Sequence, residues 1–139
     1  MRDVLSPAVL SEAESLELLA SVPSGRLLYT ARAMPSVVPA RHALLGRVLV
    51  VVVDGDSQDA EVVRAVPGAV VAYEVEGAES DGQVSWYAVA VGLARFVHAA
   101  TRPPLAAPAL DAAPSCVRLE VRIDVLCARG RRTARGCGI

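Results

Sequence analysis

The sequence contains no lysine, so arginine supplies all 14 of its basic side chains. Reactions that run through a lysine Schiff base or a lysine nucleophile need a primary amine on a side chain, and the sequence excludes them. Codons for arginine, alanine, valine and glycine are favoured in GC-rich genomes. We therefore interpret this composition as a sign of bacterial ancestry that carries no chemistry.

A long apolar run, a large net charge and paired cysteines are also missing. The longest apolar run, Val48–Val53, is far below the roughly 20 residues of a membrane span, and residues 1–7 lack the apolar stretch of a signal peptide. A net charge of −1 gives no attraction to a polyanion, so we expect neither nucleic acid nor a membrane as partner. Three cysteines without a C-x-x-C pair favour free thiols, no metal site and a cytoplasmic location.

The length of 139 residues and the 53% hydrophobic content suit one domain with a single core, over residues 1–139. We expect the folded core at about 9–126 and a flexible, arginine-rich tail at 127–139. Ser11 and Glu14 match the capping-box pattern S-x-x-E, and apolar residues then recur at helical spacing until Pro23. This predicts one helix over residues 11–21.

From Gly25 onward the apolar residues recur with a period of two, which is typical of strands. Gly92 interrupts the longest of these segments and indicates a bulge or a point of close packing. The expected strands are 26–30, 37–45, 47–53, 69–76, 84–99 and 117–126, with a short helix at 58–66 and a connection at 101–114. Six strands and few helices predict a mainly β protein, a closed or nearly closed antiparallel barrel.

Several catalytic patterns are absent. There is no G-x-S-x-G elbow, and no acid can be assigned by spacing to either histidine, His42 or His98, so a serine triad is not expected. The sequence also has no G-x-G-x-x-G after a strand and no Walker pattern, which excludes the common dinucleotide and nucleoside triphosphate sites.

Two pairs of neighbouring residues are candidates for a ligand site. Arg41 and His42 point to opposite faces of one strand, so Arg41 is either a phosphate ligand or a solvated charge, and His42 either lines a cleft or lies half-buried. Trp86 shares its face with the small residues Ala88, Ala90 and Gly92. That groove either accepts a planar ligand or is filled by the protein's own side chains.

The order of these segments resembles the pyridoxamine 5′-phosphate oxidase-like family of flavin-binding split barrels. The stretches that carry the resemblance are "LSEAESLELLASVPSGRLLYT", "PSVVPARHALLGRVLVVV", "PGAVVAYEVEG" and "SWYAVAVGLARFV", which together span about residues 9–126. The resemblance implies a six-stranded antiparallel split barrel of Greek-key type, with one N-terminal helix and one short helix after the third strand. It also implies a homodimer that holds FMN, or a deazaflavin, in a cleft between subunits.

Carried over position by position, the resemblance implies a set of cofactor-binding residues and no catalytic residue. The set is Arg41, His42, Val52, Val53, Ser57, Gln58, Arg64 and Trp86. The T-x-x-G-S-K type turn that holds phosphate in many relatives reads Val53-Asp54-Gly55-Asp56-Ser57-Gln58 here, without the hydroxyl at its start and the lysine at its end.

Two functions follow. The first is a small FMN- or deazaflavin-dependent oxidoreductase acting on an unidentified small molecule. The second is a flavin-free dimeric binding or regulatory module on the same fold, which the missing lysine and the two aspartates of the turn favour.

Overall fold

The computed structural model describes residues 8–56, 58–78, 84–97 and 116–130, which form seven strands and two helices. The elements are β1 (Ala8–Val9), α1 (Glu12–Ser21), β2 (Ser24–Ala31), β3 (Met34–Leu45), β4 (Val48–Val53), α2 (Ala60–Val63), β5 (Val70–Ala78), β6 (Val84–Phe96) and β7 (Val117–Gly130).

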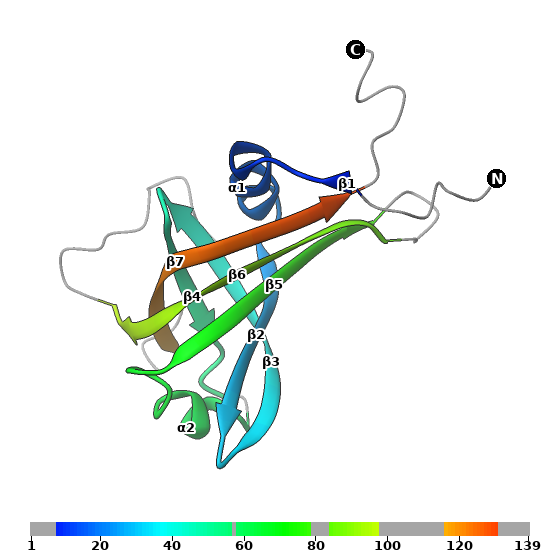
Figure 1. Ribbon diagram of the computed structural model, residues 1–139. Coiled ribbons are helices and arrows are strands. Elements are labelled where there is room, and N and C mark those ends of the chain that lie inside the picture. The colour runs from blue at the N-terminus through cyan, green and yellow to red at the C-terminus, as the bar shows by residue number, and fades with distance from the viewer. Residues whose placement is uncertain (1–7, 57, 79–83, 98–115, 131–139) are drawn as a thin grey trace.

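Six of the strands close into an antiparallel barrel (Figure 1). The hydrogen-bonded order is β4-β3-β2-β5-β6, and β7 closes the barrel because it pairs with β4 on one side and with β6 on the other. Beyond the barrel, β5, β6 and β7 continue as an arm, where the short β1 pairs with the end of β7. The expected mainly β, six-stranded antiparallel barrel is confirmed.

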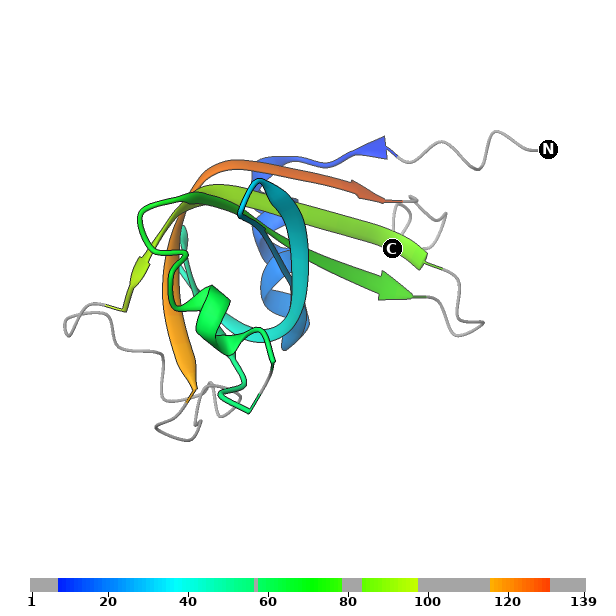
Figure 2. The same ribbon diagram turned by 90° about the horizontal axis from the view of Figure 1, so that it is seen from below.

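Alternate side chains of each strand point into the barrel and form one apolar core. In β4 these are Leu49, Val51 and Val53, all fully buried. The helices close the two ends: α1 contributes Leu19 to the core, and α2 contributes Val63 (Figure 2). The expected capping box is present, since the Ser11 hydroxyl accepts the Glu14 N–H and the Glu14 carboxylate accepts the Ser11 N–H.

The predicted irregularity at Gly92 is confirmed. The pairing of β6 with β7 shifts register between Val91 and Gly92, where Val91 faces Val125 and Gly92 faces Ile123. Asp124 is therefore the extra residue of a β-bulge. Gly92 also lies so close to the Arg122 carbonyl that there is no room for a Cβ atom at this position.

The first hairpin differs from the prediction. The expected strands 26–30 and 37–45 leave residues 31–36 as their connection, but the turn consists of Arg32 and Ala33 alone, and β3 begins at Met34. Pro35 and Pro39 are tolerated because β4 pairs with β3 only from Arg41 onward, so this half of β3 has a neighbour on one side alone.

The C-terminal boundary also differs. The tail was expected to begin at residue 127, but β7 continues to Gly130 because β6 pairs with it as far as Trp86 and β1 pairs with Gly130 and Arg129. The rest of the tail, residues 131–139, and the expected connection at 101–114 lie outside the described residues. Within the described part, no helix is long and apolar enough to cross a membrane.

Candidate functional site

Two arginines flank Val52 on the outer face of the barrel. Arg41 of β3 is the cross-strand partner of Val52, and Val52 is in turn the partner of Arg118 on β7. Directly paired residues share one face of a sheet, so the three side chains form a row across β3, β4 and β7. Arg118 is not among the site residues predicted from the sequence. The alternation along residues 117–126 could place it on the outer face, but it does not reveal which strand pairs with β7.

An apolar strip continues from this row along β4 and is covered. Val50 and Val52 are only 2% and 1% exposed, and Ala43, Val97 and Cys116 pack against them. The second of the two predicted flanking valines, Val53, points into the barrel and belongs to the main core. Within one chain, therefore, neither Val52 nor Val53 presents an open surface to a flat ring.

His42 lies inside the barrel rather than on its outer face. Its side chain is 4% exposed and forms an edge-to-face contact with Tyr73, with the ring centroids 4.9 Å apart. Nδ1 is 2.7 Å from the Tyr73 hydroxyl, and Nε2 is 2.8 Å from the backbone oxygen of Leu19. Contact between His42 and a cofactor remains a prediction, and it would require the ring to leave both of these partners.

The carbonyl of Leu19 determines which nitrogen of His42 carries the proton. A carbonyl only accepts, so Nε2 donates to it and Nδ1 accepts from the Tyr73 hydroxyl in the neutral ring. Burial lowers the pKa of His42, although the bond to Leu19 opposes this, and burial raises the pKa of Tyr73, which keeps its proton. Leu19 lies in the last turn of α1, where backbone carbonyls lack partners in the helix. His42 thus caps α1 from within the barrel and fixes the strand segment that carries Arg41.

The predicted phosphate turn directly follows β4, which ends at Val53. Gln58 is exposed, and Arg64, just after α2, forms a 2.6 Å ion pair with Glu61. Asp54 accepts the backbone N–H of Asp56, which makes the stretch a local turn. Ser57 lies outside the described residues. Binding of phosphate by Gln58 and Arg64 stays a prediction.

Trp86 lies on the arm, far from the arginine row. It pairs with Gly77 and Gly130, and its indole covers Gly77. Gly130 is twelve residues along β7 from Arg118, or about 40 Å of extended strand. Within a single chain, Trp86 and Arg41 therefore do not form one site.

Comparisons with known proteins agree with this architecture. Residues 11–118 match the model of a family described as pyridoxamine 5′-phosphate oxidase. An uncharacterized protein of Mycobacterium tuberculosis is 36% identical over 93 residues, which cover 60% of this chain and only 57% of that relative. A FAD-binding protein of Mycobacterium smegmatis has a TM-score of 0.62 at 22% identity, covering 88% of this chain and 97% of that one. A FAD-binding protein of Mesorhizobium loti has a TM-score of 0.63 at 20% identity, with coverages of 88% and 96%. At these identities the solved structures show a shared fold.

Proposed function

This chain belongs to the pyridoxamine 5′-phosphate oxidase family, and from that membership we propose that it binds a flavin and acts as a small flavin-dependent oxidoreductase. The observation that carries the proposal is the row of Arg41, Val52 and Arg118. A guanidinium offers a planar pair of donors that matches a phosphate group, and two of them on one face suit a phosphate or a pyrophosphate. FMN is the cofactor expected from the sequence, and the two solved relatives are FAD-binding proteins.

The proposed division of labour follows from where the side chains lie. When bound, a flavin supplies hydride or electron transfer. Arg41 and Arg118 bind its phosphate, and His42 positions Arg41 by fixing β3 to α1. His42 does not act as an acid or a base, because both of its ring nitrogens are engaged within the core. The free thiols of Cys116 and Cys127 are consistent with a reducing compartment, and we propose that the protein acts in the cytoplasm.

Replacement of Arg41 tests the phosphate site. We expect Arg41→Ala to weaken FMN or FAD binding about ten-fold or more, because a charge-assisted hydrogen bond contributes about 1.5–3 kcal/mol. The melting temperature of the flavin-free protein should change little, since Arg41 lies on the outer face. Isothermal titration of each flavin into wild type and variant measures the effect.

Arg95→Ala is the matched control, because Arg95 is an exposed arginine on the outer face of β6 and lies outside the row. It should bind flavin as tightly as wild type. Equal affinity of Arg41→Ala and wild type would show that Arg41 does not bind the flavin. A loss of the same size in Arg95→Ala would show that the weaker binding follows from the change in net charge alone.

A second candidate is a flavin-free binding or regulatory module, and the covered strip on β4 favours it. A flat ring cannot reach Val50 or Val52 while Val97 and Cys116 pack on them, and two exposed aspartates stand in the phosphate turn. A ligand at 100 times its dissociation constant adds about 2.7 kcal/mol of stability. An unchanged melting temperature in millimolar FMN and FAD, with no flavin absorbance in the purified protein, would favour the flavin-free module over the flavin-dependent oxidoreductase.

We also propose a homodimer, in which Trp86 of a second copy could approach Arg41. An apolar row on the outer face supports it: Leu28 pairs with Ala72, Ala72 with Val91, and Val91 with Val125. Leu28 is 38% exposed, and the neighbouring Val70 is 66% exposed. We expect wild type to sediment as a dimer at micromolar concentration and Leu28→Asp as a monomer, because burial of an unpaired carboxylate is costly.

Met34→Asp is the control for this experiment, since Met34 is 66% exposed but lies at the hairpin, outside the row. It should remain a dimer. A monomeric wild type would contradict the dimer itself, whereas a dimeric Leu28→Asp would move the interface to another face.

A further inference from the structure

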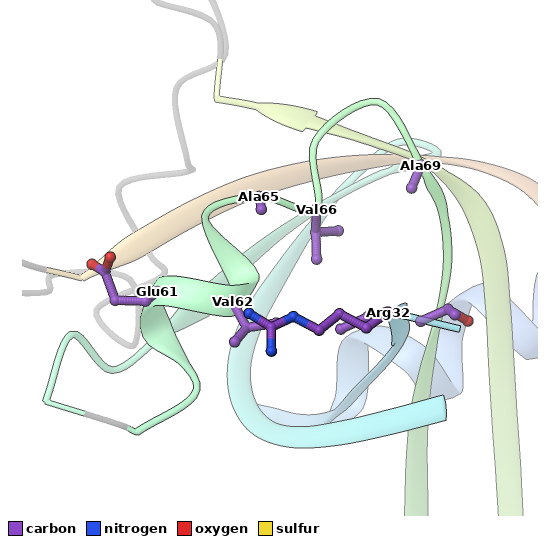
Figure 3. Close-up of a pocket in the computed structure, with 8 residues that line it drawn as sticks. Arg32, Glu61, Val62, Ala65, Val66 and Ala69 are labelled. Carbon is purple, nitrogen blue, oxygen red and sulfur yellow. The ribbon is translucent and has the colours of Figure 1, made fainter. Parts of the chain in front are cut away.

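A cleft of about 430 Å³ lies between the β2–β3 hairpin and the segment that includes α2 (Figure 3). Its lining includes Thr30 and Arg32 from the hairpin side and the apolar side chains of Val62, Ala65 and Val66 from the α2 side. None of the residues of the arginine row lines it. Its volume lies in the range of small-molecule sites, so the cleft is large enough for a ligand of its own.

The backbone of the hairpin is strained where it positions the charge of this cleft. Arg32 and Ala33 form the two-residue turn, with φ of 52° and 65°. Hairpin turns with positive φ usually use asparagine, aspartate or glycine, because a Cβ atom is unfavourable in that region. Figure 3 shows the Arg32 side chain extending across the cleft toward Val62. A costly conformation of this kind is more often found at binding sites than elsewhere.

The guanidinium of Arg32 is available to bind a ligand in this cleft. Among the residues that the structure describes, no hydrogen bond or ion pair engages its guanidinium. Glu61, the carboxylate in the lining, forms its ion pair with Arg64 instead. Within the described part of the chain, the cleft thus combines an apolar wall, one cation without a partner and one acid that already has a partner.

We propose that this cleft binds a small monocarboxylate with an apolar body. The planar guanidinium of Arg32 matches a carboxylate, and Val62, Ala65 and Val66 cover the apolar body. Thr30 also lines the cleft, and its hydroxyl can form a further hydrogen bond. A phosphate dianion fits less well, because the described lining residues offer it one arginine, Arg32, together with the acid Glu61.

The test follows backbone amide resonances of the full chain by NMR while octanoate, octanol or acetate is added. We expect octanoate to shift the resonances of residues 30–33 and 61–69, acetate to have no effect, and octanol to bind more weakly than octanoate. Arg32→Asn removes the charge with a residue that accepts positive φ, so the hairpin is kept. This variant should bind octanoate about ten-fold more weakly and octanol as wild type does.

Two further variants separate charge from shape. Arg95→Asn, an arginine outside the cleft, should leave octanoate binding unchanged, and Ala65→Phe should fill the cleft and block octanoate and octanol alike. Octanoate that shifts no cleft resonance at millimolar concentration, or that binds Arg32→Asn as tightly as wild type, would overturn the proposal. Neither result bears on the flavin titrations, which concern the face formed by β3, β4 and β7.

Discussion

Gly92→Ala is expected to lower the free energy of unfolding by about 3 kcal/mol, a cost typical of an overpacked core. The added methyl group would overlap the backbone carbonyl of Arg122, and Gly92 is buried where β6 and β7 shift register. A flexible side chain could move aside, but a strand carbonyl can move only with its ladder. Alanine is otherwise better than glycine within a strand by roughly 0.5–1 kcal/mol, and the overlap outweighs this gain. Urea unfolding measures the loss, and thermal unfolding should show a melting temperature about 10 °C lower.

Gly46→Ala is the matched control for this prediction. Gly46 has φ of 64° in the turn between β3 and β4, and beyond its two chain neighbours no heavy atom lies within 4 Å of an added Cβ. Only the conformational cost applies there, so a loss of about 1 kcal/mol is expected. If Gly92→Ala were as stable as Gly46→Ala, β6 and β7 would not approach each other as closely as the structure shows.

The sequence predicted this barrel well because each of its signals is local. Alternation identified the strands, Ser11 and Glu14 identified the helix, and a glycine within an apolar strand identified the bulge. The predictions were wrong where pairing with a strand that is distant in the sequence determines the local structure. Arg32 and Ala33 form a turn that their residue types do not favour, since the pairing of β2 with β3 imposes it. Likewise, β7 continues to Gly130 because β1 and β6 pair with it.

The candidate site was harder to predict, because it depends on which strands become neighbours. Arg41 could be singled out by residue type, but its companion Arg118 is 77 residues away and joins it only through Val52. The sequence also did not determine which face of β3 points into the barrel. Alternation shows that Arg41 and His42 point in opposite directions, whereas only the barrel decides that His42 is the inner residue. Trp86 was grouped with this site by resemblance, and the length of β7 separates the two within one chain.

His42→Leu is expected to lower the free energy of unfolding by about 3 kcal/mol near neutral pH. Leucine fills the space, but it leaves the backbone oxygen of Leu19 and the hydroxyl of Tyr73 without the imidazole. Each buried polar group that loses its partner costs about 1–3 kcal/mol. Tyr73 retains a weak alternative, because its hydroxyl lies 3.4 Å from the backbone oxygen of Ala40. Urea unfolding of wild type and variant at the same pH measures the difference.

The same substitution should remove a pH dependence. Burial lowers the pKa of His42 below its ordinary value of 6.5 in the folded chain. Between that lowered pKa and 6.5, the unfolded chain binds more protons than the folded chain, so wild-type stability falls as the pH falls through this window. The slope is at most about 1.4 kcal/mol per pH unit for one proton. Above pH 6.5 the contribution of His42 to stability is complete.

His98→Gln provides the control, because His98 is the other histidine of the sequence and lies outside the described residues. Unfolding curves should be compared from about one pH unit above to about one unit below the ordinary histidine pKa of 6.5. Wild type and His98→Gln should lose stability in parallel toward acid, while His42→Leu should show a flatter profile. A slope that vanishes in His98→Gln instead would contradict the buried, neutral His42. Parallel slopes in all three proteins would show that other groups determine acid stability, and His42 would then cap α1 without sensing pH.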